Sequence, residues 1–251
     1  MRGDVAVLEV DHVSRRFGGL LAVDGVSLSV AGGDRLAVIG PNGAGKTTLF
    51  RLIAGELRPT AGSVSLFGRD VTRAPAHRRA RMGLSRTFQV SNLFPTLTVE
   101  ENVRLAAYGR DRRRWRFWWP LSRRDEESRR GAELLARAGL DRRRGARVAE
   151  LSHGEQRQLE IAMALATGPD LLLLDEPFAG LSAAERPVLG ELIRSLPDGL
   201  AILLIEHDIG LALSLCHRVL CLDRGRPVAS GTPDEMRADE RVHAAFLGQR
   251  T

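Results

Sequence analysis

The chain has 251 residues, enough to bury a large core as one α/β domain or as a domain that carries a smaller lobe. Its hydrophobic fraction of 43% and aromatic fraction of 5% are ordinary for a globular protein, and no apolar run reaches the roughly 18 residues that a membrane span needs. The first residues lack the apolar stretch of a signal peptide, so we expect the chain to stay in the compartment where it is made.

The net charge of +6 invites a nucleic-acid or membrane-surface partner. Much of the excess is local, because residues 110–130 carry nine arginines against four acids. A general basic face is therefore not implied. Cys216 and Cys221 are the two cysteines, and their apolar surroundings predict buried thiols in a reducing compartment.

The first predicted elements are strands at 5–10 and 26–30, with an aromatic residue before a glycine pair between them. Phe17 stands in front of Gly18 and Gly19. Such a ring is more often a core residue than a ligand contact. The phosphate-binding pattern that follows makes stacking on a nucleotide base a second interpretation.

Residues 40–48 match the phosphate-binding pattern G-x-x-x-x-G-K-[ST]. An apolar strand at 35–40 leads into it and a helix at 46–54 leaves it, which is the context that the pattern needs. Glycines let several N–H groups approach one anion, and the start of the helix adds its positive dipole end. The nine loop residues predicted to bind the nucleotide are Gly40, Pro41, Asn42, Gly43, Ala44, Gly45, Lys46, Thr47 and Thr48.

Lys46 is the single lysine among 37 basic residues, and the others are arginines. A compact ammonium fits among phosphate oxygens where a planar guanidinium would not. We therefore expect Lys46 to reach the outer phosphates and the Thr47 hydroxyl to ligate Mg²⁺.

A strand predicted at 84–88 ends at Gln89, and a helix at 98–107 begins with the capping-box pair Thr98 and Glu101. Between them, the apolar and small polar residues 94–98 form a candidate docking groove for a helix of another protein. The same residues also suit a lobe that simply packs on itself.

Residues 110–124 contain all three tryptophans, interleaved with arginines. Three interpretations compete for this segment. A solvated loop packed on its own lobe is favoured over contact with lipid headgroups and over nucleic-acid binding.

A helix at 125–138 is followed by the block 151–156, which opens a helix that runs to residue 166. A wholly apolar strand at 170–175 then ends in Asp175 and Glu176, and a helix at 183–196 leads to a buried strand at 199–205 that stops just before His207. Two short strands within 218–229 and a helical tail complete the chain. Strands that alternate with helices indicate a parallel sheet covered on both faces.

Open parallel sheets hold ligands at the carboxyl ends of their strands. We expect Asp175 to assist a Mg²⁺ held by Thr47 and Gln89. Glu176 is placed to orient or deprotonate a water in line with the γ-phosphate, and His207 to contact that phosphate or the water. Strand-end acids that meet only solvent are the less favoured alternative.

With these motifs in this order, the chain resembles the ATP-binding subunit of an ABC transporter over essentially its whole length. The loop matches the family's Walker A motif, and residues 171–176 match Walker B with the catalytic glutamate. Gln89 matches the Q-loop, His207 the switch histidine, and Phe17 the aromatic that stacks on adenine. Residues 151–156 resemble the signature LSGGQ, with Ser152, Gly154 and Glu155 as expected nucleotide contacts.

The resemblance implies a P-loop NTPase (RecA-like) α/β core with a mainly parallel sheet, an antiparallel β subdomain and a helical signature subdomain. The whole chain, 1–251, would be one ABC ATPase domain. Its core with the β subdomain would cover about 1–88 and 169–251, and its helical subdomain about 89–168 with the 110–124 insert.

Two departures from the family pattern stand out. His153 and Glu155 replace the usual glycine and glutamine of the signature, while Ser152 and Gly154 keep the hydroxyl and amide that would touch phosphate. Ser182 stands where the D-loop normally has an aspartate.

The resemblance also implies an ATP- and Mg²⁺-dependent hydrolase that works as a head-to-tail homo- or heterodimer on the cytoplasmic face of the inner membrane. Its partners would be two integral membrane permease subunits and, indirectly, a periplasmic solute-binding protein, with no nucleic acid expected.

Residues 16–20, 85–89 and 204–208 are similar to the ATPases of branched-chain amino acid importers. Urea, amide or other small-solute importers and lipopolysaccharide exporters remain alternatives. A soluble, non-transport ABC ATPase is the rival of a different class.

Overall fold

The structure is a computed structural model that describes residues 6–87, 93–108 and 121–247. It divides into two compact units. The first comprises Met1–Arg86, Asp170–Glu176 and Pro197–Thr251, and the second comprises Thr87–Pro169 and Pro177–Leu196.

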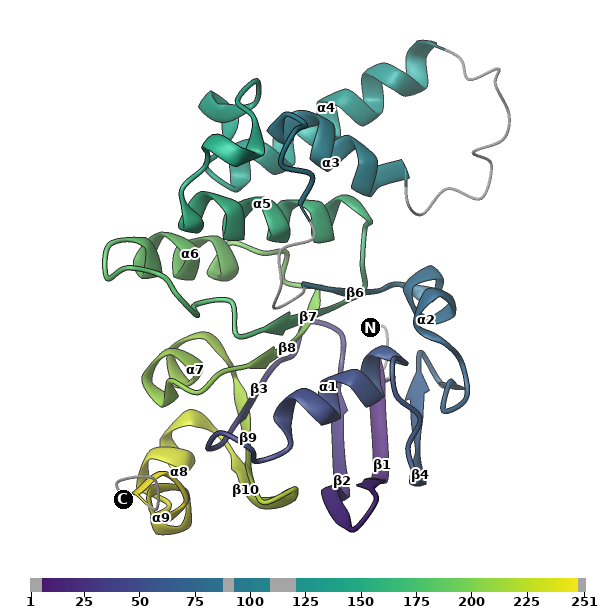
Figure 1. Ribbon diagram of the computed structural model, residues 1–251, viewed down its shortest axis with the longest axis vertical. Coiled ribbons are helices and arrows are strands. Elements are labelled where there is room, and N and C mark those ends of the chain that lie inside the picture. The colour runs from purple at the N-terminus through teal and green to yellow at the C-terminus, as the bar shows by residue number, and fades with distance from the viewer. Residues whose placement is uncertain (1–5, 88–92, 109–120, 248–251) are drawn as a thin grey trace. The chain divides into compact units, whose positions relative to one another are not determined.

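A six-stranded sheet with the strand order β10-β9-β3-β8-β7-β6 forms the centre of the first unit (Figure 1). All neighbouring strands run parallel except β9 and β10. The strands are β3 (Arg35–Ile39), β6 (Leu84–Arg86), β7 (Leu171–Asp175), β8 (Ala201–Ile205), β9 (Arg218–Asp223) and β10 (Arg226–Gly231). Every residue of β7 and β8 is buried, which explains their uninterrupted apolar sequences.

Five helices are described in this unit: α1 (Lys46–Ala54), α2 (Ala76–Met82), α7 (Ile209–Leu215), α8 (Pro233–Ala238) and α9 (Glu240–Leu247). Helix α1 begins and ends at the predicted residues, and Gly55 closes it in the left-handed conformation. Its buried face, which includes Leu49, Phe50 and Ile53, belongs to the main apolar core.

Arg79 of α2 is fully buried and closes the carboxyl end of α1. Its guanidinium donates to the carbonyl oxygens of Leu52 and Ile53, the last turn of α1, at 2.8 and 2.7 Å. Three further bonds reach carbonyls of the 71–74 segment. Burial lowers the pKa of Arg79 to about 10, so the group keeps its charge near neutral pH and complements the negative end of the helix dipole.

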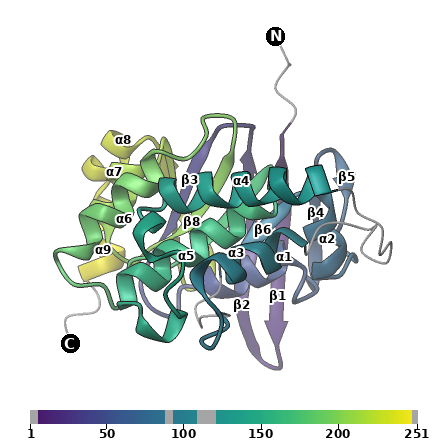
Figure 2. The ribbon, with the colours of Figure 1, turned by 90° about the horizontal axis from the view of Figure 1, so that it is seen from above.

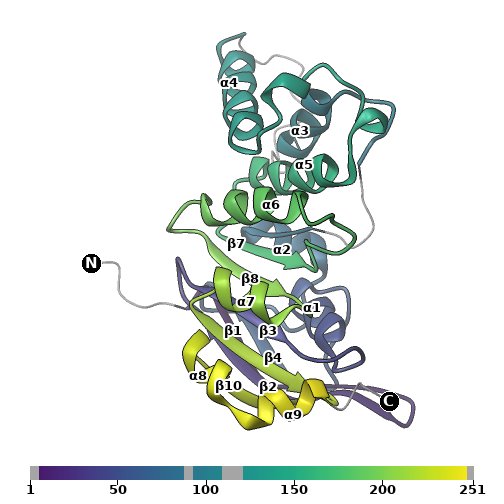
Figure 3. The ribbon, with the colours of Figure 1, turned by 90° about the vertical axis from the view of Figure 1, so that its left-hand side faces the viewer.

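The other sheet of the first unit is antiparallel, with the order β2-β1-β4-β5 (Figure 3). It contains β1 (Leu8–Phe17), β2 (Leu20–Val30), β4 (Ala61–Leu66) and β5 (Arg69–Asp70). The first two strands are longer than predicted because they form one hairpin, in which Phe17 pairs with Leu20 across Gly18 and Gly19.

The second unit is helical in its described part, with α3 (Val99–Tyr108), α4 (Leu121–Arg137), α5 (His153–Ala166) and α6 (Glu185–Arg194). Two short 3₁₀ helices, η1 (Asp141–Arg143) and η2 (Val148–Glu150), precede α5. Helices α3 and α4 lie beside α5 in Figure 2 and contact it. The predicted capping box is confirmed, because Thr98 and Glu101 exchange hydrogen bonds at the start of α3.

The predicted α/β class, with a mainly parallel sheet and a separate antiparallel one, is therefore confirmed. The sequence did not predict α2 and α7, because each is a single seven-residue helix with little periodicity.

Candidate functional site

The loop between β3 and α1 approaches neighbouring backbone so closely that only glycine fits at two of its positions. A Cβ on Gly40 would stand 2.1 Å from the Leu222 carbonyl oxygen, and one on Gly45 would stand 2.3 Å from that of Ala22. Both glycines also have positive φ angles. The loop conformation is thus fixed by contacts on its outer side, and its sequence cannot vary at these positions.

Helix α1 starts from this loop without a side-chain cap. Its N-cap residue is Gly45, which has no side chain that could cap the first turn. The first N–H groups of a helix carry the positive end of its dipole. Backbone donors and dipole therefore converge where the sequence predicts phosphate binding.

The Lys46 side chain folds back over the loop and is 5% exposed. Its Nζ donates to the carbonyl oxygens of Gly40 at 2.6 Å and Pro41 at 3.0 Å. Burial lowers the pKa of Lys46, while the nearby Glu176 and Glu206 carboxylates act in the opposite direction. A buried ammonium whose hydrogen bonds go to neutral carbonyls is well suited to a polyanionic ligand.

Two carboxylates end β7, at the same edge of the sheet as the loop. Asp175 is buried, and its Oδ2 accepts from Nη2 of Arg86 at 2.7 Å. Arg86, which ends β6, also pairs with Glu56 through Nη1. Asp175 therefore stands in a charged network rather than alone at the strand end.

Glu176 has an unusual backbone, with a φ of +45° in a residue that is not glycine. Its N–H donates to the Ile205 carbonyl oxygen of β8 at 3.1 Å. Left-handed conformations of such residues cost about 1–3 kcal/mol and cluster at functional positions. The strained backbone supports the role predicted for Glu176, which is to orient or deprotonate the attacking water.

His207 follows β8 with its side chain 52% exposed, 3.8 Å from Oε2 of Glu206. Glu206 itself is completely buried. The register pairs Asp175 with Ile205, so the ends of β7 and β8 lie level and bring Glu176 and His207 to one edge, as predicted.

Phe17 ends β1 with 42% of its surface exposed. The Arg15 guanidinium lies 4.6 Å from the centre of its ring. This distance is typical of a cation–π contact. Phe17 is therefore not a core residue, which favours the second of the two interpretations of its role.

Gln89 and the tryptophans at 115, 118 and 119 lie outside the described residues. The candidate docking segment 94–98 is described. Asn102, which is fully buried, holds it by accepting from the Phe94 N–H and donating to the Phe94 carbonyl oxygen, at 2.8 and 3.2 Å. The Phe94 side chain remains 50% exposed.

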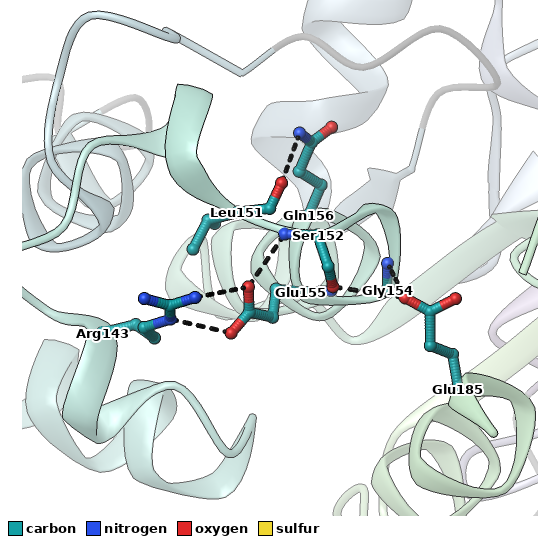
Figure 4. A network of polar contacts seen from close by, with 7 residues as sticks. All are labelled: Arg143, Leu151, Ser152, Gly154, Glu155, Gln156 and Glu185. Atoms are coloured by element: carbon teal, nitrogen blue, oxygen red, sulfur yellow. Dashed lines mark hydrogen bonds and ion pairs between the residues drawn. The ribbon is translucent and has the colours of Figure 1, made fainter. Parts of the chain in front are cut away.

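In the second unit, Ser152 is the N-cap of α5, and Glu155 completes a capping box (Figure 4). Oε2 of Glu155 accepts from the Ser152 N–H at 2.9 Å, and its Oε1 accepts from Nε of Arg143 at 2.9 Å. The Arg143 contact is the main reason why the pKa of Glu155 is lowered. Both oxygens of Glu155 are thus engaged in holding the helix end.

The same helix end binds a second carboxylate, that of Glu185 at the start of α6 (Figure 4). Its Oε1 accepts from the Gly154 N–H at 2.9 Å and from the Ser152 hydroxyl at 3.2 Å. His153 lies alongside, with Nε2 3.4 Å from the Ala179 carbonyl oxygen.

Comparison with known proteins decides the family. A model of the ABC transporter family matches residues 23–179. The chain is also 41% identical to the high-affinity branched-chain amino acid transport ATP-binding protein LivG of Salmonella typhimurium, over 97% of this chain and 98% of LivG. This chain belongs to the ABC transporter family.

Solved ABC cassettes have the same fold. The ADP conformation of the cassette MJ1267 matches with a TM-score of 0.85 at 28% identity, over 97% of this chain and 99% of MJ1267. A dimeric post-hydrolysis structure of the cassette MJ0796, bound to ADP and Pi, matches with a TM-score of 0.75 at 25% identity, over 90% of this chain and 98% of that chain. The P-loop NTPase fold and the ATPase class are thereby confirmed.

A second family model, for the branched-chain amino acid ATP-binding cassette transporter, matches residues 226–250 of this cassette. Within the described part of the chain, no helix has the length and apolar character to cross a membrane. The predicted buried thiols are found, since Cys216 and Cys221 are both buried and burial raises their pKa to about 12 and about 11.

Sequence reasoning missed three charged residues at the cassette's candidate sites, namely Arg86, Glu206 and Glu185. A local rule could have found the first two, because each is a charged residue at or just after the end of a strand in the parallel sheet. Glu185 carried a weaker signal, three residues after Ser182 in a capping-box pattern. Nothing in the sequence indicated its contact with residues more than 30 positions earlier.

Proposed function

We propose that this cassette binds ATP with Mg²⁺ and hydrolyses it as the ATPase subunit of an importer for branched-chain or other amino acids. The observation that carries the ATP site is Lys46, a buried ammonium bonded to carbonyls of its own loop at the uncapped start of α1. The amino-acid assignment is supported by the LivG identity and by the branched-chain family match at residues 226–250.

In this proposal, the backbone N–H groups of the loop, which Pro41 lacks, surround the phosphates, and Lys46 exchanges its carbonyl partners for β- and γ-phosphate oxygens. Phe17 stacks on the adenine, with Arg15 on one face of the ring leaving the other face for the base. Gln89 stays a predicted contact.

The residues present fit a Mg²⁺ ion, which prefers oxygen ligands and retains waters and phosphates around it. Thr47 supplies a hydroxyl at the first turn of α1, and Asp175 a buried carboxylate at the end of β7. Gln89 is the third predicted ligand. When bound, the ion would neutralise charge that develops on the phosphate oxygens.

Hydrolysis needs a base beside the attacking water. Glu176 would accept the water proton as the water oxygen forms a bond to the γ-phosphorus and the bond to the β-phosphate oxygen breaks. His207, at the neighbouring strand end and largely exposed, would contact the γ-phosphate or orient that water. Oε2 of the buried Glu206 lies 3.8 Å from the imidazole Nδ1.

Two copies are needed for turnover in this proposal. The Ser152 hydroxyl and Gly154 N–H of one copy would close over the ATP held by the other copy, because a helix start suits a γ-phosphate. Glu155 would hold that helix end through Arg143 and the capping box rather than donate to the nucleotide. The dimeric MJ0796 cassette supports this arrangement, with either an identical or a related second subunit.

The remaining partners follow from the same assignment. Two integral membrane permease subunits would anchor the dimer at the cytoplasmic face of the inner membrane, and a periplasmic solute-binding protein would deliver the solute to them. The half-exposed Phe94, on a segment fixed by Asn102, supports a docking surface at residues 94–98.

The dimer is tested with Glu176→Gln, which keeps the size of the side chain but removes the base. We expect this variant to bind ATP without hydrolysing it. In the presence of ATP, size-exclusion chromatography with light scattering should give the mass of a dimer. Glu176→Gln combined with Lys46→Ala should stay monomeric and serves as the control. A monomer of Glu176→Gln at saturating ATP would contradict the proposed function.

The solute is tested separately by uptake of labelled leucine and labelled urea in cells that lack this chain, with and without a plasmid that restores it. Restoration of leucine uptake alone supports the amino-acid assignment. Restoration of urea uptake alone moves the cassette to the small-solute alternative.

A further inference from the structure

The two oxygens of the Glu185 carboxylate bind different helix starts. Oε2 accepts from the N–H and the hydroxyl of Ser182, at 3.0 and 2.8 Å, in the turn that leads into α6. Oε1 instead accepts from Gly154 and Ser152 at the start of α5 (Figure 4). One side chain therefore serves two helix ends with separate atoms.

This arrangement occupies two donors at the α5 start, the Ser152 hydroxyl and the Gly154 N–H. A backbone amide has one proton, and so does a serine hydroxyl. The Ser152 oxygen already accepts from the Glu155 N–H at 3.2 Å, and its proton is directed to Glu185. Neither Ser152 nor Gly154 can donate to a second anion while Oε1 is in place.

The position is shaped for close approach by an anion. A Cβ at residue 154 would stand 2.6 Å from Oε1 of Glu185, so glycine is required for the contact. The Ser182 bonds, followed by those of Gly154 and Ser152, lower the pKa of Glu185 to about 2, and the carboxylate is ionised at neutral pH. A full negative charge thus lies at the positive end of the α5 dipole.

We infer that Glu185 is an internal competitor of the γ-phosphate, bound to the two donors that would close over ATP in the partner copy. The inference rests on the proposed dimer. ATP-driven closure then exchanges one anion for another, because carboxylate and phosphate cannot share the two protons and would repel each other. Oε2 stays on Ser182 during the exchange, so the side chain is released from α5 but retained on α6.

Such a competitor raises the ATP concentration that is needed for closure. If Glu185 is a competitor, its removal should favour the dimer. If Glu185 only stabilises the start of α5, its removal should weaken the dimer. The two interpretations therefore predict opposite signs, and the sign can be measured.

The experiment uses the full chain in the Glu176→Gln background and follows the dimer fraction against ATP concentration by analytical ultracentrifugation. Glu185→Gln removes the charge at nearly constant shape, and Glu185→Asp keeps the charge but shortens the reach by one methylene. Glu235→Gln is the matched control, since Glu235 forms the same type of capping box with Thr232, but at the start of α8 rather than α5. Melting temperatures without ATP show that each variant is folded.

We expect Glu185→Gln to lower the ATP concentration at half-dimerisation by about fivefold or more, the lower end of usual coupling effects, and Glu185→Asp to shift it in the same direction. Glu235→Gln should leave it unchanged. If every folded Glu185 variant needs the same or more ATP than its parent, the inference is overturned. If the parent Glu176→Gln itself does not dimerise, the proposed function fails instead.

Discussion

Two helix starts in this protein, those of α1 and α5, have the same positive dipole end but neighbouring side chains of opposite charge. At α1, no side chain caps the helix, and the buried ammonium of Lys46 adds positive charge. At α5, the carboxylates of Glu155 and Glu185 take the Ser152 and Gly154 donors. Both ends are predicted nucleotide contacts, but the neighbouring side-chain charge is positive at α1 and negative at α5.

From this difference we expect that a helix start does not by itself set anion affinity. The dipole and backbone donors contribute a modest favourable term at either end. The charges of neighbouring side chains then set the anion affinity. We expect high affinity beside an ammonium, and lower affinity where a carboxylate must first be displaced. The following changes test each side of this comparison, beginning with the α1 end.

Lys46→Arg should have the largest effect. The planar guanidinium does not fit the space between the Gly40 and Pro41 carbonyls, where the ammonium lies at 2.6 and 3.0 Å. We expect ATP turnover to fall at least about 100-fold, as when one preorganised donor to a transition state is lost. Steady-state phosphate release measures the effect.

The melting temperature of Lys46→Arg should stay close to that of the parent chain. Arg226→Lys, at an exposed ion pair with Asp24, is the control and should keep normal turnover. Near-normal turnover of Lys46→Arg would mean that the site does not depend on a compact cation.

Arg86→Gln tests the network behind the α1 end. It removes the cation that pairs with the buried Asp175 at 2.7 Å, and breaking a buried pair costs about 3 kcal/mol or more. Because a bound Mg²⁺ would supply positive charge beside Asp175, the loss should shrink when Mg²⁺ and ATP are present. Chemical denaturation with and without both ligands measures it.

Arg226→Gln, which removes an exposed pairing, should cost less than about 1 kcal/mol in either condition. An equal loss for Arg86→Gln with and without Mg²⁺ and ATP would argue against a metal beside Asp175.

The smallest effect concerns the α5 end and its dependence on pH. The hydrogen bonds from Ser182 lower the pKa of Glu185 from its ordinary value of 4.5 to about 2, so the stabilisation is present above pH 4.5 and is lost as the pH falls through 2. The stability difference between the parent chain and Glu185→Gln should therefore narrow as the pH falls through that window. Melting curves across it, without nucleotide, measure the change, and a constant difference would contradict the assigned contacts.

The sequence predicted the α1 end well because its signals are local. Pattern, strand and helix lie within 20 consecutive residues, and the observed bounds of α1 agree with the prediction. The strand-end placement of Asp175, Glu176 and His207 followed from parallel-strand logic and holds in the structure. The left-handed backbone of Glu176 could not be foreseen, because no sequence rule predicts strain.

The contacts between charged residues could not be predicted from the sequence, because their partners are far apart along the chain. Arg86 and Asp175 are 89 positions apart, and Gly154 and Glu185 are 31 apart, so only the folded chain brings them together. Burial of an arginine is also contrary to expectation, and the fully buried Arg79 is explained only by the carbonyls around it. The role of Gln89 stays a prediction, as does that of the tryptophan segment.

Arg79 is a position in this arginine-rich chain where the structure requires an arginine. Its fork makes five hydrogen bonds to main-chain oxygens, and a lysine has only three protons to offer. If the arginines of this chain were replaced by lysine, we expect most solvated positions to tolerate the exchange, but not position 79. Two buried basic positions thus have opposite requirements, because position 46 calls for the compact ammonium and position 79 for the guanidinium.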